Sequence, residues 1–235
     1  MENGERKKLT IQDFQKEYQN KKGEIRRRLD DFKRIWREGS DEKIFSELSY
    51  CICTPGTKAE VSDKAVSEMK ENELLYRGTQ DKIASFLQSK VRFHNHKARY
   101  IVETRKFFSQ NGNLRIRSAL GGLKSPLNQV QCSNRKSNIL RDWLAENPRV
   151  MGLGFKEASH FLRNIGLGED LAILDRHILR NLVRYRVIRE IPKTLTRRRY
   201  LEIEEKMRNF AERMKIPLEE LDLLFWSFET GRVLK

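Results

Sequence analysis

Cysteine is scarce in this sequence, which holds three in 235 residues. An odd count argues against a disulfide framework. Cys51 and Cys53 stand close together, but two thiols cannot hold an iron–sulfur cluster. They make no zinc site either, because the four histidines provide no ligand spacing beside them. We therefore expect neither group as a cofactor, and we predict that both thiols are buried in a helix.

Long apolar runs are also absent. No stretch approaches the roughly 18 consecutive apolar residues of a membrane-spanning helix, and the polar first residues lack the apolar core of a secretory signal. We expect an intracellular protein with no membrane partner. Strand signals are missing too, because no alternating pattern is found and Asn111-Gly112 follows a predicted helix with no strand after it. The fold class predicted from these absences is all-α.

Apolar residues at helical spacing run through most of the chain. The stripe from Ile25 to Ile35 predicts a helix that Gly39 ends, and a second stripe ends at Thr54-Pro55-Gly56. The segment 57–60 has the form of a capping box, which predicts a third helix. Its inward residues are predicted to be Val61, Ala65 and Met69. Further helices are predicted at residues 81–88, 95–108 and 133–146, after Thr196 and after Pro217. Residues 111–131 are predicted to be irregular, and the first twenty residues to be an extension.

The charge is strongly positive, with 48 Lys and Arg against 33 Asp and Glu, a net of +15. Residues 104–141 hold eight basic residues and no acidic one, and residues 176–199 hold nine against one. Arg176, Arg180 and Arg184 are four apart, so they share one helix face. A basic helix can be merely a solvated face. Two acid-poor blocks nevertheless favour a polyanionic partner, because binding phosphates releases counterions.

Residues 148–166 carry the most informative pattern. Asn147-Pro148 stops the preceding helix, a short turn holds Gly152 and Gly154, and a new helix begins near Phe155. The glycines allow tight backbone geometry and let a phosphate approach the free amides at the helix start. An ordinary tight turn is the alternative. The pattern is typical of a helix-hairpin-helix, a device that grips a DNA backbone, at about residues 135–166.

Lys156 stands in the first turn of the helix after the hairpin. A lysine is electrostatically disfavoured there, because a helix amino terminus carries positive partial charge. That field, together with partial burial, favours a neutral amine that can attack an electrophile. The alternative is an exposed lysine tolerated at small cost. The aspartate that stands nineteen residues later in the chain favours the nucleophile.

Asp175 follows Lys156 by nineteen residues and comes directly after the apolar run 171–174. Aspartate is a favoured N-cap, so capping the next helix is one interpretation. The other is catalytic, because a carboxylate can stabilise positive charge that develops on a sugar as its base departs. Both interpretations can hold at once.

The sequence resembles the helix-hairpin-helix DNA glycosylase superfamily, and most of all the second class of 8-oxoguanine DNA glycosylase/AP lyases, found in archaea and some thermophilic bacteria. The matching segments are 92–93 with 97–98, 152–164, 172–180, 190–195 and 230–235. The similarity runs from about residue 25 to the end. It implies that Lys156 attacks C1′ of a flipped-out nucleotide and forms a Schiff base, that β-elimination then breaks the strand, and that Asp175 assists.

The resemblance also implies how the damaged base is recognised. In the family two aromatic rings sandwich the base, and by position they are Phe93 and Trp226. Trp226 lies off the apolar stripe of its own helix, so it can face a cleft, while core packing is the alternative for both rings. The terminal Lys235, with its free carboxylate, is implied in reading the base, and a frayed end is the alternative.

Further roles are assigned to the hairpin and to the basic helix. Gly152, Gly154, Arg176 and Arg180 are predicted to contact the DNA backbone. The family binds a monovalent cation, Na⁺ or K⁺, through hairpin carbonyls that correspond to Pro148, Val150 and Leu153. The expected partner is double-stranded DNA containing 8-oxoguanine. We expect a monomer in the cytoplasm of a prokaryote, with the chromosome.

The predicted architecture is two helical subdomains that flank an active-site cleft. Residues 1–56 are expected to pack with residues 175–235, and residues 57–174 to form the other subdomain. Two alternatives remain open: the same chemistry on another oxidised base, or a non-catalytic helix-hairpin-helix module that only binds DNA. A pure binding module would need neither Lys156 nor Asp175 at these positions.

Overall fold

A computed structural model describes residues 11–124 and 133–233 of the chain. The elements in chain order are α1 (Ile11–Glu38), α2 (Asp41–Cys53), α3 (Ala59–Glu71), α4 (Leu74–Arg77), α5 (Gln80–Leu87), α6 (His94–Phe107), β1 (Ser109–Gln110), β2 (Asn113–Leu114), α7 (Ile116–Lys124), α8 (Ser133–Glu146), α9 (Phe155–Asn164), α10 (Arg176–Arg184), α11 (Arg197–Met214) and α12 (Leu218–Thr230). The all-α prediction is confirmed. Within the described residues, no helix is long and apolar enough to cross a membrane.

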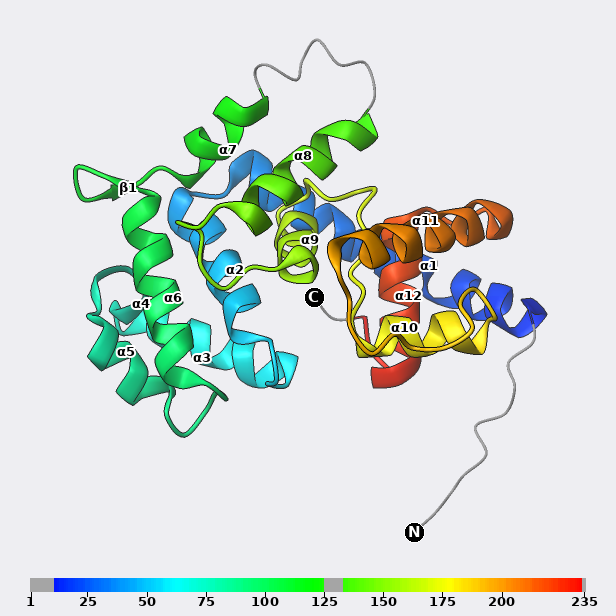
Figure 1. Ribbon diagram of the computed structural model, residues 1–235, viewed down its shortest axis with the longest axis horizontal. Helices are drawn as coiled ribbons and strands as arrows, with labels where there is room; N and C mark the ends of the chain where they lie inside the picture. The colour runs from blue at the N-terminus through cyan, green and yellow to red at the C-terminus, as the bar shows by residue number, and fades with distance from the viewer. Residues whose placement is uncertain (1–10, 125–132, 234–235) are drawn as a thin grey trace.

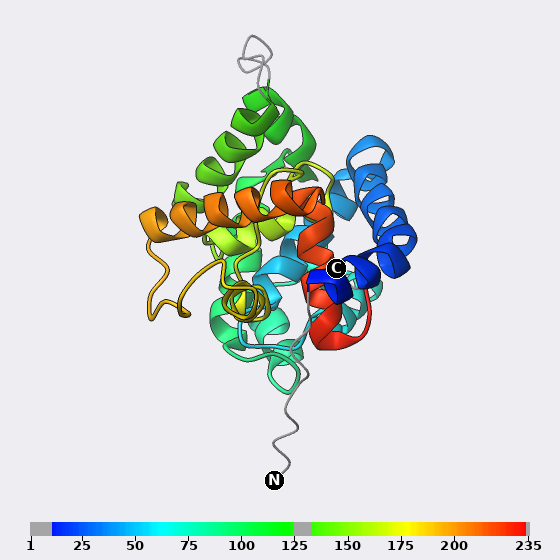
Figure 2. The same ribbon diagram turned by 90° about the vertical axis from the view of Figure 1, so that its right-hand side faces the viewer.

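The helices divide into two groups, each with its own hydrophobic core. One core is formed by α2 to α9 together with Leu171. The other is formed by α1, α10, α11 and α12, with Ala172, Leu174 and Val233. Figure 1 shows the first group on the left and the second on the right. In the turned view of Figure 2, α1 runs along one edge of the second group while α11 crosses its front.

The boundary between the two groups differs from the predicted one. From the sequence, residues 41–56 were expected in the half that contains the C-terminal helices. In the structure, α2 is buried inside the other core, where Ile44, Leu48 and Ile52 are among its members. The division therefore falls in the short link between α1 and α2, near Gly39. The apolar periodicity predicts that α2 has a buried face, but not which partner covers it.

The helix α1 begins earlier than predicted. Residues 11–20 are its first turns and are not an extension, because Phe14 and Tyr18 are buried in the second core. The Phe14 ring makes edge contacts with Tyr185 and Phe210 at 5.0 and 5.9 Å between ring centroids. The Tyr18 hydroxyl donates a hydrogen bond of 2.6 Å to Glu220 on α12. The predicted extension at residues 1–10 lies outside the described residues.

The connection between α6 and α8 is also more regular than predicted. A short antiparallel hairpin pairs Ser109 with Leu114 and Gln110 with Asn113. Asn111 and Gly112 both have positive φ, at 51° and 78°, as a two-residue hairpin turn requires. The expectation that no strand follows this pair was wrong, because two-residue strands are too short to show alternation. Helix α7 then occupies part of the segment predicted to be irregular. Residues 125–131 lie outside the described residues.

The capping box predicted at residues 57–60 is not formed. Helix α3 begins at Ala59, and its N-cap residue Lys58 makes no side-chain capping bond. The Thr57 hydroxyl instead accepts hydrogen bonds from the Arg92 backbone amide at 3.3 Å and from the Lys97 ammonium at 3.2 Å. The Thr57 hydroxyl is thus used by residues far away in the chain and does not cap α3. One of the three residues predicted to face inward, Val61, is 37% exposed, whereas the other two are buried.

Two buried ion pairs join the two helix groups. Arg163 of α9 contacts Asp222 of α12 at 2.5 Å, and Arg141 of α8 contacts Glu204 of α11 at 2.7 Å. All four side chains are at most 5% exposed. Removing one partner of such a pair leaves an uncompensated buried charge, which lowers the free energy of unfolding. The first pair therefore holds α9 against α12, and the second holds α8 against α11.

Candidate active site

A pocket of about 760 Å³ lies between the two helix groups. One wall comes from the end of α2, the loop that follows it and α9. The other wall comes from the start of α10 and from α12. The charged side chains in its lining are Lys58, Glu60, Arg92, Lys156, Arg163, Asp175, Arg176 and Asp222. Both residues that the sequence analysis assigned to catalysis are in this set, on opposite walls.

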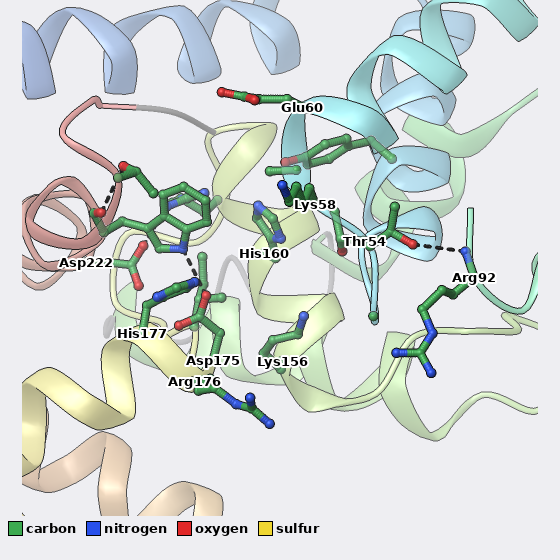
Figure 3. Close-up of a pocket in the computed structure, with 18 residues that line it drawn as sticks. Thr54, Lys58, Glu60, Arg92, Lys156, His160, Asp175, Arg176, His177 and Asp222 are labelled. Atoms are coloured by element: carbon green, nitrogen blue, oxygen red, sulfur yellow. Dashed lines mark hydrogen bonds and ion pairs between the residues drawn. The ribbon is translucent and has the colours of Figure 1, made fainter. Parts of the chain in front are cut away.

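Lys156 is placed by the hairpin between α8 and α9. Gly154 is the N-cap of α9, so Lys156 is the second residue of the helix. Ala158 and Leu162 bury the opposite face of α9 and hold it against the core. The Lys156 side chain is 24% exposed and points into the pocket (Figure 3). Its Nζ lies 3.0 Å from a carboxylate oxygen of Glu157, a contact that the sequence analysis did not consider.

Asp175 is the N-cap of α10, and it also lines the pocket. Its Oδ1 accepts a hydrogen bond of 2.8 Å from the Ile178 backbone amide, and its Oδ2 accepts one of 2.9 Å from the Trp226 indole. The capping interpretation is therefore correct, and capping does not prevent the carboxylate from facing the pocket. Figure 3 draws Asp175 and Lys156 among the side chains that line the pocket.

The chain that leads to Asp175 is held in place from α11. Residues 171–174 are all buried. The Tyr200 hydroxyl donates to the Ala172 carbonyl at 2.6 Å, and Glu204 accepts from the Ala172 amide at 2.8 Å. Burial raises the pKa of the Tyr200 hydroxyl, which therefore stays a neutral donor. These bonds fix the position at which α10 starts, and so the position of its cap.

The hairpin itself has the backbone geometry that its glycines predict. Gly152 has a φ of 83°, and a side chain there would meet the Tyr100 ring at 2.6 Å. Thr104 on α6 holds the turn in place, because its hydroxyl accepts a hydrogen bond of 2.9 Å from the Met151 amide. Gly154 is exposed at the start of α9, where the first amides of a helix lack partners within the helix. An anion can therefore approach these amides.

The other residues predicted to contact the DNA backbone lie on α10. Arg176 and Arg180 are both exposed, and Arg176 also lines the pocket. No backbone amide among residues 11–124 and 133–233 donates a hydrogen bond to the hairpin carbonyls of Pro148, Val150 and Leu153. Within residues 11–124 and 133–233, no group of three or more His, Cys, Asp and Glu side chains is placed to hold a metal ion.

The two aromatic residues predicted to sandwich the base are in different situations. Trp226 lines the pocket and is partly buried. Phe93 is 59% exposed, so it is no core residue, and it does not line the pocket, although its neighbour Arg92 does. Phe93 is also the N-cap of α6 with a φ of 58°, an uncommon conformation for an aromatic residue. Lys235 lies outside the described residues.

Most of the other residues that line the pocket were not predicted from the sequence, and two of them stand one helical turn from a predicted residue. His160 is one turn beyond Lys156 on α9, and Asp222 is one turn before Trp226 on α12. The spacing of four residues places each pair on one helix face, and this signal could have identified both. Asp222 is buried, and burial together with the nearby charge of Asp175 raises its pKa to about 7 despite the ion pair with Arg163.

Lys97 supports the loop that forms one edge of the pocket. Its buried ammonium donates to the carbonyls of Cys53 and Pro55 at 2.6 and 2.7 Å, as well as to Thr57. Burial lowers the pKa of Lys97 to about 8. The loop after α2 is therefore tied to α6, although the two segments are forty residues apart. The thiols of Cys51 and Cys53 are buried in α2, as predicted, while Cys132 lies outside the described residues.

Known proteins are similar to this chain in sequence and in fold. A family model described as 8-oxoguanine DNA glycosylase matches residues 25–216. An 8-oxoguanine DNA glycosylase/AP lyase of Fusobacterium nucleatum is 42% identical over 223 residues, which are 95% of this chain and 96% of that protein. One of the same name from Methanocaldococcus jannaschii is 37% identical over 213 residues, which are 90% of this chain and 91% of that protein. A crystal structure of the Methanocaldococcus jannaschii 8-oxoguanine glycosylase/lyase in complex with a 15mer DNA containing 8-oxoguanine superimposes with a TM-score of 0.79 at 36% identity, covering 96% of this chain and 99% of that one.

Proposed function

The chain belongs to the 8-oxoguanine DNA glycosylase family, and we propose how its own residues carry out the reaction of that family. The protein excises 8-oxoguanine from DNA and then cleaves the strand as an AP lyase. The observation that carries our assignment is that Lys156 and Asp175 line one pocket from opposite walls. A pocket of about 760 Å³ is in the range of small-molecule sites and suits an extruded nucleoside.

In the first step the Lys156 amine attacks C1′ of the flipped nucleotide. The bond between C1′ and the base breaks, and the base leaves with the electron pair. Because only the unprotonated amine is nucleophilic, the Lys156 ammonium has to give up a proton before it attacks, and the Glu157 carboxylate at 3.0 Å can accept it, which ends the ion pair. Asp175 faces the sugar with a negative charge and stabilises the positive charge that develops there.

In the second step the adduct at C1′ becomes a Schiff base between Lys156 and the opened sugar. Loss of a proton from C2′ then allows the bond between C3′ and its oxygen to break, which cuts the strand. The carboxylate of Asp175 is suited to assist proton transfer here, since it lies in the same pocket as the amine. One lysine thus serves both the glycosylase and the lyase step.

The hairpin and α10 are proposed to hold the DNA. The exposed start of α9 at Gly154, with Gly152 in the turn, offers amides to a phosphate, and Arg176 and Arg180 offer charge on the same side of the pocket as Asp175. We assign Trp226 to one face of the base, because it lines the pocket. The assignments of Phe93 and Lys235 to base recognition stay predictions.

We propose no iron–sulfur cluster and no zinc for this enzyme. A monovalent cation, Na⁺ or K⁺, can bind at the hairpin through the carbonyls of Pro148, Val150 and Leu153. The three carbonyls lie in the turn between α8 and α9, and no backbone amide of the described residues donates a hydrogen bond to them. There a cation would neutralise charge beside a DNA phosphate. We propose a monomer that works in the cytoplasm, where its DNA substrate lies.

Borohydride trapping tests the assignment of the nucleophile. A Schiff base with 8-oxoguanine duplex should be reduced to a covalent complex by the wild type but not by Lys156→Gln, which should still bind the duplex. Lys58→Gln is the matched control, because Lys58 is a second lysine in the lining, and it should trap normally. Equal trapping by Lys156→Gln, or loss of trapping only in the control, would remove our mechanism and favour a binding module. A panel of duplexes with other oxidised bases tests the alternative substrate.

A further inference from the structure

The indole of Trp226 makes a contact that base stacking does not require. Its Nε1 donates a hydrogen bond of 2.9 Å to Oδ2 of Asp175, drawn as a dashed line in Figure 3. The two residues are 51 positions apart in the chain and lie on different helices. A stacking ring needs only its face, whereas this bond uses the edge and is directed at the proposed catalytic carboxylate.

This bond completes the orientation of the Asp175 carboxylate. The other oxygen, Oδ1, is occupied by the Ile178 amide at 2.8 Å. Two donors from two helices, one on each oxygen, fix the carboxylate plane, which would otherwise rotate broadly about its terminal torsion. Hydrogen bonds to an ionised acceptor are stronger than neutral ones. Orientation of this kind is what a group that stabilises developing charge needs before the reaction begins.

The indole is itself held in place. The His177 ring contacts the Trp226 ring edge-on, with centroids 5.5 Å apart. One residue before Trp226, the Phe225 carbonyl accepts a hydrogen bond of 3.3 Å from Asn181 of α10. Helices α10 and α12 are thus tied together beside the indole. Neighbouring contacts therefore hold the Trp226 ring at the pocket wall, where its N–H can keep the Asp175 carboxylate in one orientation.

We propose that Trp226 is a positioning residue for Asp175, whose carboxylate its indole N–H orients in both the base-excision and the strand-cleavage step. This inference rests on the proposed catalytic role of Asp175. It predicts an effect that stacking alone cannot produce. An abasic site has no base to stack on, yet its cleavage still requires an oriented carboxylate.

The test uses Trp226→Phe, which keeps an aromatic face and removes the N–H donor. Single-turnover rates are measured with the full chain on two duplexes, one with 8-oxoguanine and one with an abasic site. We expect both rate constants to fall about tenfold or more, the effect of losing a hydrogen bond to a charged group. Affinity for a duplex with a non-cleavable abasic analogue should change less than about twofold, because phosphate contacts dominate it.

A different result would overturn the inference. If Trp226→Phe cleaves the abasic duplex at the wild-type rate and slows only the excision of 8-oxoguanine, Trp226 only stacks and the inference is overturned. Trp226→Leu also lacks the indole N–H and brings no other donor, so it should repeat the loss on the abasic duplex, which has no base to stack. Only a variant whose melting temperature equals that of the wild type is used for the test. If such a variant cleaves the abasic duplex at the wild-type rate, the inference is overturned.

Two controls separate this inference from the proposed function. Trp143→Phe makes the same chemical change on α8, outside the pocket lining, and should leave both rates unchanged. If Asp175→Asn retained full activity, the proposed role of Asp175 would fail, and the inference with it. If Asp175→Asn is inactive while Trp226→Phe cleaves abasic DNA normally, only the inference fails.

Discussion

The carboxylate of Asp175 accepts two hydrogen bonds of different origin. The bond from Ile178 is local and belongs to the helix start, while the bond from Trp226 crosses from another helix. The residue caps α10, and we propose that it also serves the chemistry of the pocket. A substitution that keeps the first property and removes the second separates the two roles.

Asp175→Asn is that substitution. Asparagine caps a helix about as well as aspartate, but its NH2 group cannot accept the bond from Trp226, so we expect a melting temperature only slightly below that of the wild type. The negative charge that faces the sugar is lost, and excision should slow by about 100-fold or more, the usual effect of removing a preorganised electrostatic group. Thermal melting and single-turnover kinetics are the measurements. A large loss of stability with only a proportional loss of activity would reduce Asp175 to a cap.

At the scale of elements, the turn between α8 and α9 connects the backbone that we propose to contact DNA with Lys156, the proposed nucleophile. Gly152 has a φ of 83° and leaves no room for a side chain beside Tyr100. The turn is also held by a hydrogen bond from the Met151 amide to the Thr104 hydroxyl of α6. Any change in its path moves the start of α9, and with it Lys156.

Gly152→Ala should therefore be destabilising. The strained backbone costs on the order of 1–3 kcal/mol, and the ring contact at 2.6 Å adds to that cost. We expect a lower melting temperature and weaker binding to duplex DNA. Gly121→Ala on α7 is the matched control, because a methyl group there meets no atom within 4 Å, and the change should be neutral or stabilise by about 0.5–1 kcal/mol. Unchanged melting and binding in Gly152→Ala would contradict this account of the hairpin.

At the scale of the whole molecule, the pocket exists because two separate cores meet. The pair Arg163–Asp222 joins them beside the pocket, and Arg141–Glu204 joins them farther along. Two influences compete at Asp222. The charge of Arg163 favours its ionised form, while burial and the charge of Asp175 disfavour it, and burial dominates, so the pKa is raised.

A raised pKa has a defined effect on stability. Between the unfolded pKa of 3.8 and the folded value of about 7, the native state binds more protons at Asp222, so its contribution to stability falls as pH rises. Asp222→Asn mimics the protonated form and does not titrate. The melting temperature of the variant minus that of the wild type should therefore rise between pH 5 and pH 8, whatever constant cost the variant pays for leaving Arg163 without a charged partner. A variant that becomes relatively less stable at pH 8 would show that the pair with Arg163 prevails over burial.

The sequence by itself determined the features that local rules control. Proline and glycine stop α8 and form the turn, so the hairpin and the place of Lys156 were predictable. Asp175 follows a buried run, and its capping role is a local bond to a residue three positions away. The all-α class follows from helical periodicity in the same way. Each of these signals spans only a few residues.

Only the tertiary structure decided which distant segments meet. It moved α2 into the core of the middle helices and brought the hydroxyl of Thr57 to Lys97 in place of a helix cap. It also brought Trp226 to Asp175 across 51 residues of chain. Periodicity shows that a face is apolar but not what covers it, and a polar side chain accepts whichever donor the packing supplies. For that reason the list of catalytic candidates came from the sequence, while their mutual orientation came from the fold.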